Sequence, residues 1–329
     1  MTDQPFDLHM PAARLSPAVF SSPHSGSEYP AELLARTRLD LAQLRSSEDA
    51  FVDELFRPAP EHGAPLIAAR APRAWIDLNR ASEDLDPAVV EGAARRPGNP
   101  RIAAGLGVIP RVVAEGRHIQ DGKLPMAVAT ARIARFWDPY HARLGALLAE
   151  SRAMFGTAIL FDCHSMPHDA LAAAPMLRGR RPDVILGDRF GASCERWLIE
   201  AVSEAFTAAG FAVARNAPFA GGYITQRHGS PQSGVQALQI EIDRALYMDE
   251  RRIERRAVVS GGGVGEIGVA GCGAAAFCLR DIGQHQVARQ VQARKGIALL
   301  GGLEIRVARR QHVDDLLGLL RDGEGGGMH

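Results

Sequence analysis

Short apolar runs alternate with amphipathic segments along the first 256 residues of the chain. The apolar runs are bounded by Pro, Gly or polar residues, which is typical of buried β-strands. They predict strands at residues 18–22, 65–69, 73–78, 157–161 and 211–215. Apolar residues at helical spacing predict helices at 30–44, 48–56, 126–137, 140–155 and 189–209, with Pro139 as a breaker. This alternation predicts an α/β fold, with a mostly parallel central sheet and helices on both faces.

Two stretches depart from this alternation. Residues 84–117 are rich in Gly, Pro and Arg and show little periodicity. An irregular segment of this length inside a domain is usually either functional or disordered. From residue 257 onward, glycines and small residues dominate and no catalytic constellation appears. We therefore expect a catalytic domain over residues 1–256, followed by a region, 257–329, that is either a small module or a loosely ordered tail. The sequence assigns no function to this region.

Three short segments, the third at residues 239–244, each end an expected strand with polar residues of the kinds that a catalytic zinc requires. His24 lies in PHSG, His164 lies in DCHS, and Glu241 lies in QIEIDR. In an open α/β sheet, ligands bind at the carboxyl ends of the strands. A hydrolytic zinc site takes two histidines and a carboxylate and leaves the fourth position to water. Either histidine alone would also fit a hydrogen-bonded core residue, but the three segments together favour a metal site.

Composition narrows the class of partner. Lys plus Arg equals Asp plus Glu at 38 each, so the chain has no basic field for nucleic acid or an anionic membrane. We expect a small-molecule ligand instead. No apolar run approaches the length of a membrane span, and the first residues lack the pattern of a signal peptide. The four cysteines have no paired spacing. These features favour a cytoplasmic protein and leave its oligomeric state open.

Seven segments follow one another in a recognisable order: PHSG, SEDAFVDELF, RAWIDLNR, GLGVIPRVVAEGR, FDCHS, NAPFAGGYITQRHG and VQALQIEIDRALYM. In this order they resemble the N-formylglutamate amidohydrolases, also called formylglutamate deformylases. The resemblance extends from about Val19 to Arg255 and leaves residues 257–329 outside. That family is distantly similar to the zinc carboxypeptidases and shares their fold. The resemblance implies hydrolysis of N-formyl-L-glutamate, a dicarboxylate, to formate and L-glutamate in histidine breakdown, with one Zn²⁺ per chain.

The resemblance also implies a set of metal ligands. His24 and His164 match the two metal histidines. The carboxylate ligand is less direct, because the spacing of the carboxypeptidases would require an acid where this chain has Ser27. We therefore assign it to the acidic pair Glu48 and Asp49 and prefer Asp49. The alternative is that both acids only cap a helix.

Glu241 matches the general base of the family. Its two isoleucine neighbours indicate a buried strand, on which an acid without a role or partner would be costly. Asp162 lies two residues before His164, on the same strand face, and is expected to orient it. Cys163 points to the opposite face, so we interpret it as a core residue rather than a nucleophile.

The substrate residues are implied by the same resemblance. Asn79 and Arg80 match the pair with which carboxypeptidases hold a substrate carboxylate. For Arg80 the alternative is a surface ion pair with a nearby aspartate. Arg73 and Arg111 are further candidates, either for the second carboxylate or for polarising the carbonyl. The loop containing Asn216, Gly221, Gly222 and Tyr223 is expected to bring backbone amides near the ligand, and His228 is a weaker candidate contact.

Three other functions stay open. The first is the same chemistry on another N-acyl amino acid or a small peptide. The second is a ligand-binding protein that has lost catalysis, against which Glu241 argues, since a binding module needs no base. The third is a cysteine hydrolase that uses Cys163 and His164, against which the divergence of adjacent strand residues argues.

Overall fold

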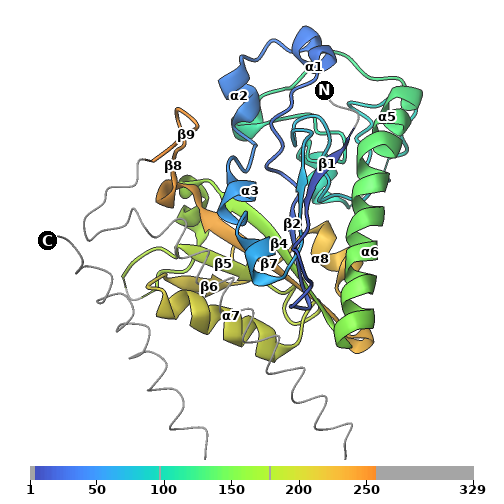
Figure 1. The fold of residues 1–329 in the computed structure, drawn as a ribbon. Helices are drawn as coiled ribbons and strands as arrows, with labels where there is room; N and C mark the ends of the chain where they lie inside the picture. Colours follow the sequence, from blue (N-terminus) through green and yellow to red (C-terminus); the bar gives the residue numbers. More distant parts are fainter. Residues whose placement is uncertain (1–3, 96–97, 178, 257–329) are drawn as a thin grey trace, which may run out of the picture. The chain divides into compact units, whose positions relative to one another are not determined.

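A seven-stranded sheet forms the centre of the part of the chain that the structure describes, residues 4–95, 98–177 and 179–256 of a computed structural model (Figure 1). Its strand order is β1-β3-β2-β4-β7-β5-β6. The inner strands β3, β2, β4 and β7 run parallel, whereas β1 and β5 pair antiparallel with β3 and β7. The strands are β1 Phe6–His9, β2 Ala18–Ser22, β3 Leu66–Ala69, β4 Ala158–Met166, β5 Val184–Gly187, β6 Val213–Arg215 and β7 Val235–Asp243. The prediction of an α/β fold with a mostly parallel sheet is confirmed.

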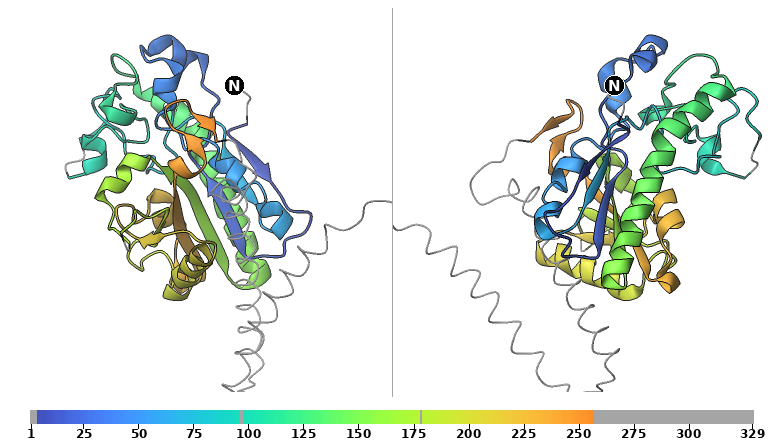
Figure 2. Two further views of the ribbon diagram at one scale, coloured as in Figure 1. Left: turned by 90° about the vertical axis from the view of Figure 1, so that its left-hand side faces the viewer. Right: turned by 45° about the vertical axis from the view of Figure 1, so that its right-hand side comes forward.

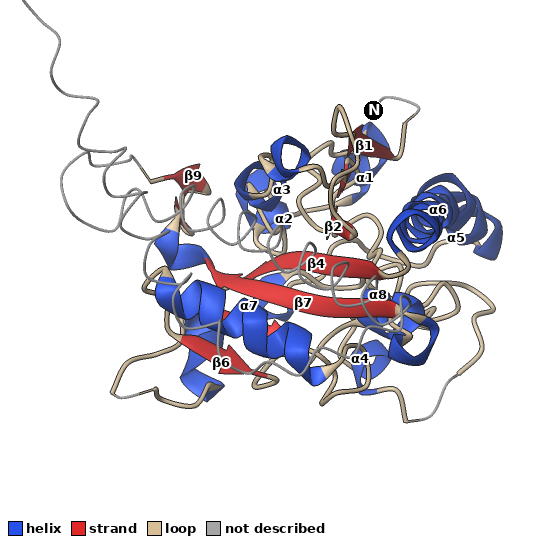
Figure 3. Cartoon of the chain, turned by 60° about the horizontal axis from the view of Figure 1, so that its bottom comes forward, coloured by secondary structure: helices blue, strands red, loops and turns tan. Residues whose placement is uncertain are grey.

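Helices cover both faces of this sheet (Figure 3). One face packs against α6 Asp138–Phe155 and α8 Tyr223–His228. The other packs against α3 Val52–Leu55 and α7 Arg196–Ala208. The remaining elements are short: α1 Ala31–Arg36, α2 Leu41–Arg45, η1 Ala59–His62, α4 Pro100–Ala103, η2 Ala114–Gly116, α5 Met126–Arg132, η3 Ile133–Trp137, η4 His168–Ala173, η5 Pro231–Ser233, η6 Arg244–Leu246, β8 Met248–Asp249 and β9 Glu254–Arg255.

Strand alternation decides which side chains reach the candidate site. On β4, Phe161 and Cys163 pack into the core beneath α3 and α7. Asp162 and His164 therefore face the other side, because successive strand residues alternate between faces. β4 and β7 are parallel and in register, so that His164 lies beside Glu241. A polar layer thus continues across two adjacent strands at their carboxyl ends.

Several predicted elements differ in the structure. Residues 73–78 form turns rather than a strand, because the amides of Trp75 and Ile76 bond to the Pro72 carbonyl at 2.8 and 3.2 Å. Strand β5 was not predicted. Residues 30–44 divide into α1 and α2, and of 48–56 only α3 is helical.

The two predicted helices around Pro139 are instead one continuous rod of α5, the π-helical turn η3 and α6, which Figure 2 shows alongside the sheet. Pro139 lies just after the π-helical turn, where the hydrogen-bond pattern of the rod already changes. The helix predicted from residue 189 begins only at Arg196. Arg189 and Phe190 adopt left-handed backbone conformations (φ 53° and 56°), and the amide of Phe190 bonds to the Asn216 side chain at 3.4 Å.

The region predicted to follow the catalytic domain, residues 257–329, lies outside the described residues. Among the helices that the structure describes, none has both the length and the apolar character needed to cross a membrane.

Candidate metal centre and substrate cavity

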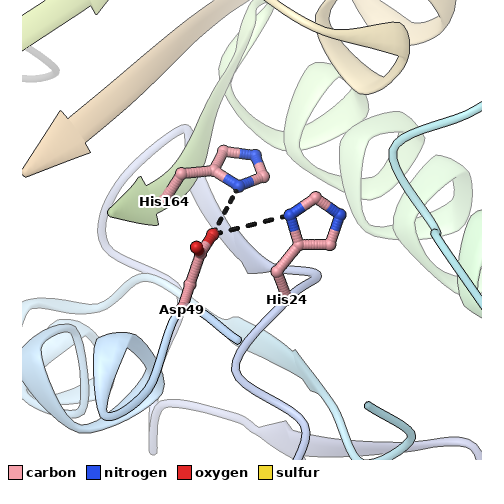
Figure 4. A group of neighbouring side chains, drawn as sticks. All are labelled: His24, Asp49 and His164. Carbon is pink, nitrogen blue, oxygen red and sulfur yellow. Dashed lines mark hydrogen bonds and ion pairs between the residues drawn. The ribbon is translucent and has the colours of Figure 1, made fainter. Parts of the chain in front are cut away.

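Three buried side chains from separate parts of the chain meet at one point (Figure 4). His24 follows β2, Asp49 lies between α2 and α3, and His164 lies near the end of β4. Asp49 Oδ2 is 3.0 Å from His164 Nδ1 and 3.5 Å from His24 Nδ1. One candidate ligand atom from each residue lies within 4.8 Å of the other two. Two imidazoles and a carboxylate are the ligand types of a catalytic zinc site.

The outer nitrogen of each imidazole is held by other side chains. His24 Nε2 lies 2.7 Å from Asp77 Oδ1. His164 Nε2 lies 3.1 Å from Asp162 Oδ2 and 3.1 Å from Asn79 Nδ2. A proton on Nε2 leaves the lone pair on Nδ1, which is the form in which a histidine binds a metal. His24 Nδ1 is buried and has no hydrogen-bond partner among the described residues. A metal ion at the shared point would satisfy it, so these residues fit a zinc ion.

Asp49, rather than Glu48, belongs to this cluster. Glu48 turns away and pairs with Arg45 at 2.9 Å and with the Tyr29 hydroxyl at 3.1 Å. The second oxygen of Asp49 accepts a hydrogen bond from Arg244 Nη2 at 3.0 Å, which leaves Oδ2 directed at the histidines. Burial raises the pKa of Asp49, but its contacts with the two histidines outweigh burial and hold the pKa well below its usual value.

Glu241 lies beside the metal cluster as a buried acid. One of its carboxylate oxygens accepts a hydrogen bond from Gln239 Nε2 at 2.6 Å. Burial raises the pKa of Glu241 to about 7, with the positive charge of His164 acting in the opposite direction and Asp49 adding to the rise. A carboxyl group with a pKa near neutrality can both accept and return a proton, as a general base requires.

These residues line one cavity of about 460 Å³. It contains the metal cluster, Glu241 and four arginines, Arg73, Arg80, Arg101 and Arg244. An apolar wall completes it, formed by Leu106, Pro110, Val112, Val113, Met166, Pro167, Pro218 and Phe219. A largely apolar cavity with a few convergent charged groups is typical of a binding site for a small molecule.

Asp77 links the metal cluster to two of the arginines. Its Oδ1 faces His24, while its Oδ2 accepts a hydrogen bond from Arg73 Nε at 3.0 Å and lies 3.8 Å from Arg80 Nε. Burial lowers the pKa of Arg73, but Asp77 and Asp49 outweigh burial and raise it. Burial also lowers the pKa of Arg80, to about 10. Both arginines remain cationic at neutral pH.

A scan against protein-family models matches residues 16–248 to the family described as N-formylglutamate amidohydrolase. The chain belongs to the N-formylglutamate amidohydrolase family. A protein named N-formylglutamate deformylase from Pseudomonas aeruginosa is 34% identical over 245 residues, covering 71% of this chain and 83% of the relative. A protein of the same name from Pseudomonas putida is 30% identical over 241 residues, with coverage of 71% and 82%.

Solved structures agree with this family membership. The crystal structure of an N-formylglutamate amidohydrolase from Ralstonia eutropha has a TM-score of 0.76 and 34% identity, covering 87% of this chain and 99% of that one. A protein of Agrobacterium tumefaciens has a TM-score of 0.51 at 19% identity, with coverage of 88% and 96%, and shares the fold. The amidohydrolase family name and the cavity together identify the chain as a hydrolase.

Two predicted substrate residues of this family member have other contacts in the structure. Arg111 is not among the residues that line the cavity; it forms an ion pair with Asp86 at 3.0 Å. Asn79 lines the cavity, but its Oδ1 accepts a hydrogen bond from the Ile224 amide at 2.7 Å and its Nδ2 faces His164. Asn79 Nδ2 also donates to Asp162 Oδ2 at 3.4 Å, so Asn79 positions the carboxylate that holds His164.

Gly221 and Gly222 of the glycine loop line the cavity and Cys163 is a core residue, as predicted, whereas His228 lies outside the cavity lining. A Cβ on Gly222 would lie 2.3 Å from Asn79 Nδ2, so this glycine permits close packing on Asn79. His228 stacks on His141 at 5.4 Å instead of lining the cavity. Cys163 is buried in the opposite core, away from His164.

Sequence reasoning did not assign roles to Asp77, Gln239, Arg101 and Arg244. A signal existed for three of them. Asp77 stands two residues before the Asn-Arg pair, and Gln239 stands two residues before Glu241 on the same strand face. Arg244 follows β7 at the carboxyl edge of the sheet. Arg101 lies on α4 inside the irregular segment, where no periodic pattern could single it out.

Proposed function

We propose that the chain is a zinc-dependent amidohydrolase that cleaves N-formyl-L-glutamate to formate and L-glutamate. The observation that supports this most is the convergence of two imidazole Nδ1 atoms and one carboxylate beside a buried acid, in a cavity rich in arginine. The names of the Pseudomonas relatives supply the substrate. A role in histidine breakdown and a cytoplasmic location enter the proposal from the family resemblance alone.

The residues of the cluster have separate tasks in this reaction. His24, Asp49 and His164 hold the ion, which when bound polarises the formyl carbonyl and acidifies a water molecule. Glu241 accepts the proton of the attacking water and passes it to the leaving amide nitrogen. Its burial, which raises the pKa of Glu241 in the metal-free protein, suits both steps, since the same group must be basic first and acidic afterwards.

The arginines orient the substrate. Arg73 interacts electrostatically with Asp49 and with Glu241, so its guanidinium lies at the reacting end of the cavity. There it can bind the α-carboxylate or the formyl oxygen. Arg80 donates from Nε to the Leu106 carbonyl at 2.9 Å and from Nη1 to the Asn79 carbonyl at 2.6 Å. These bonds fix its planar group for binding a carboxylate.

The direct test combines metal analysis with a formate-release assay on the purified full chain. We expect about one zinc per chain, loss of turnover on chelation and recovery when zinc is returned. His24→Ala and His164→Ala should each lose both metal and turnover. His118→Ala, an exposed histidine outside this cavity, should lose neither. Full activity in the metal-free protein would refute the metal-dependent mechanism.

One observation favours a second candidate function, hydrolysis of larger N-acyl amino acids. The apolar wall of the cavity offers contacts that a formyl group cannot use. Comparing N-formylglutamate with N-acetylglutamate and N-butyrylglutamate decides between the two. A higher kcat/KM for the longer acyl groups would favour the second function.

A further inference from the structure

The four arginines of the cavity differ in how their charge is compensated. Arg244 bonds to Asp49, and Arg73 bonds to Asp77 and interacts with Asp49 and Glu241. Arg101, an exposed residue, differs from both, because among the described residues it has no ion pair with a carboxylate of the kind that Arg73 and Arg244 have. It nevertheless lines the cavity, and its charge acts on Arg80. Two guanidinium groups therefore face the same part of the cavity without enough negative charge between them.

The backbone holds these two arginines in one arrangement. Arg80 Nε donates to the Leu106 carbonyl, and the Leu106 amide donates to the Arg101 carbonyl at 2.8 Å. Asn99 caps α4 by accepting hydrogen bonds from the amides of Arg101 and Ile102 at 3.0 and 3.3 Å. The irregular segment is thus tied to Arg80 at the point where Arg101 enters the cavity.

The aspartates near Arg80 do not balance two guanidinium groups, because Asp77, 3.8 Å from Arg80, is shared with Arg73 and His24. Asp84 also acts on Arg80, more weakly than Asp77, and a hydrogen bond from Asn99 Nδ2 at 3.1 Å holds its carboxylate. Arg80 is 4% exposed, so water solvates its charge poorly. A buried charge without a full complement is costly in the free protein and favours binding of a group of opposite charge.

We propose that Arg101 and Arg80 together bind the side-chain carboxylate of a glutamate-type substrate, which makes Arg101 a specificity-determining residue. The proposal rests on the proposed function of the same cavity. The α-carboxylate is attached to the carbon that bears the scissile nitrogen, so it lies near the metal cluster and Arg73. The side-chain carboxylate is two methylenes further away. Leu106, in the wall between the two arginines, supplies an apolar contact for those methylenes.

The test changes Arg101 to Gln and compares two substrates, N-formylglutamate and N-formylglutamine. The second differs only in having an amide in place of the side-chain carboxylate. Arg101→Gln should lower kcat/KM for N-formylglutamate about five- to thirtyfold, mostly through KM, because one charge-assisted contact at a partly solvated site is lost. Turnover of N-formylglutamine should change less than twofold. Arg117→Gln is the matched control, since Arg117 belongs to the same segment but does not line the cavity.

Titration calorimetry with L-glutamate and L-glutamine separates this proposal from the proposed function. The zinc-loaded parent should bind glutamate more tightly than glutamine, and Arg101→Gln should reduce that preference at least fivefold. This holds even if the parent fails to hydrolyse N-formylglutamate, a result that would refute the proposed reaction but not the subsite. Equal losses on both substrates, or an unchanged preference for glutamate in Arg101→Gln, would overturn the assignment of Arg101.

Discussion

The Glu241→Gln variant tests whether Glu241 transfers the proton during hydrolysis. The change keeps the shape of the side chain, and its amide oxygen can still accept the hydrogen bond from Gln239. It removes the ability to accept a proton at neutral pH. Zinc should remain bound, because Glu241 is not one of the three clustered residues His24, Asp49 and His164.

The expected loss of turnover follows from the role proposed for this acid. General acid–base catalysis contributes about two to four orders of magnitude, so kcat should fall by about that amount while KM changes little. Glu48→Gln is the matched control, because Glu48 is also a buried glutamate but pairs with Arg45 outside the metal cluster. That variant should keep its zinc and most of its turnover.

The Glu241→Gln change should lower turnover but raise the stability of the metal-free protein. Burial raises the pKa of Glu241 from 4.5 to about 7 in the folded protein. At 1.36 kcal/mol for each pKa unit, this difference corresponds to a cost of about 3 kcal/mol for the ionised group. The cost is absent below pH 4.5, where the acid is neutral in both states, and is complete above pH 7. The metal-free Gln variant should therefore be more stable than the metal-free parent at pH 8 and equally stable at pH 4.

Formate release under saturating zinc measures the first effect, and chemical denaturation after chelation measures the second. An inactive but more stable variant that retains zinc is the expected combination, because a catalytic group often costs stability. Near-normal turnover would refute the assignment of Glu241 as the base. A Gln variant less stable than the parent at pH 8 would show that the ionised acid stabilises the fold.

Three further predictions test the frame around the cavity. Asp77→Asn should weaken zinc binding about 10- to 100-fold in a chelator competition, because His24 Nε2 would lose the carboxylate to which it donates. Gly222→Ala should lower both the melting temperature and zinc affinity, since its Cβ would displace Asn79; Gly145→Ala, where a Cβ meets no atom within 4 Å, should lower neither. Arg80→Lys should lower kcat/KM for N-formylglutamate about ten- to a hundredfold and affect a substrate without the contacted carboxylate much less, and equal losses on both would assign Arg80 to the fold.

The positions of the two histidines could be predicted because both follow apolar strands. Parallel strands bring their carboxyl ends to one edge of the sheet, so His24 and His164 had to approach each other once β2 and β4 were recognised. Asp49 could not be placed in this way. It reaches the site from a loop, where its amide bonds to the His24 carbonyl at 3.0 Å and Arg244 binds its carboxylate. Only the family resemblance separated it from Glu48.

Tertiary contacts explain the elements that were predicted wrongly. Residues 73–78 contain an apolar pair typical of a strand. The centre of the Trp75 ring nevertheless lies 3.2 Å from the guanidinium carbon of Arg132, and the Trp75 carbonyl accepts a hydrogen bond from Arg132 Nη1 at 3.1 Å. Contacts of this kind join positions far apart in the chain and leave no periodic signal. Strand β5 was missed for a related reason, because it is a four-residue run within an irregular segment.

The segment 73–80 shows why the metal and the substrate depend on the same few residues. Asp77 contacts His24 and two arginines, and Asn79 lies against His164 while it accepts a hydrogen bond from the Ile224 amide at the start of α8. Asn79 Oδ1 is engaged by the Ile224 amide, and Nδ2 donates one of its two hydrogens to Asp162. Both members of the predicted substrate pair, Asn79 and Arg80, line the cavity, and Asn79 also positions Asp162 beside His164. Because this segment holds His24 through Asp77 and carries Arg73 and Arg80, a change in it should alter zinc affinity and substrate affinity together.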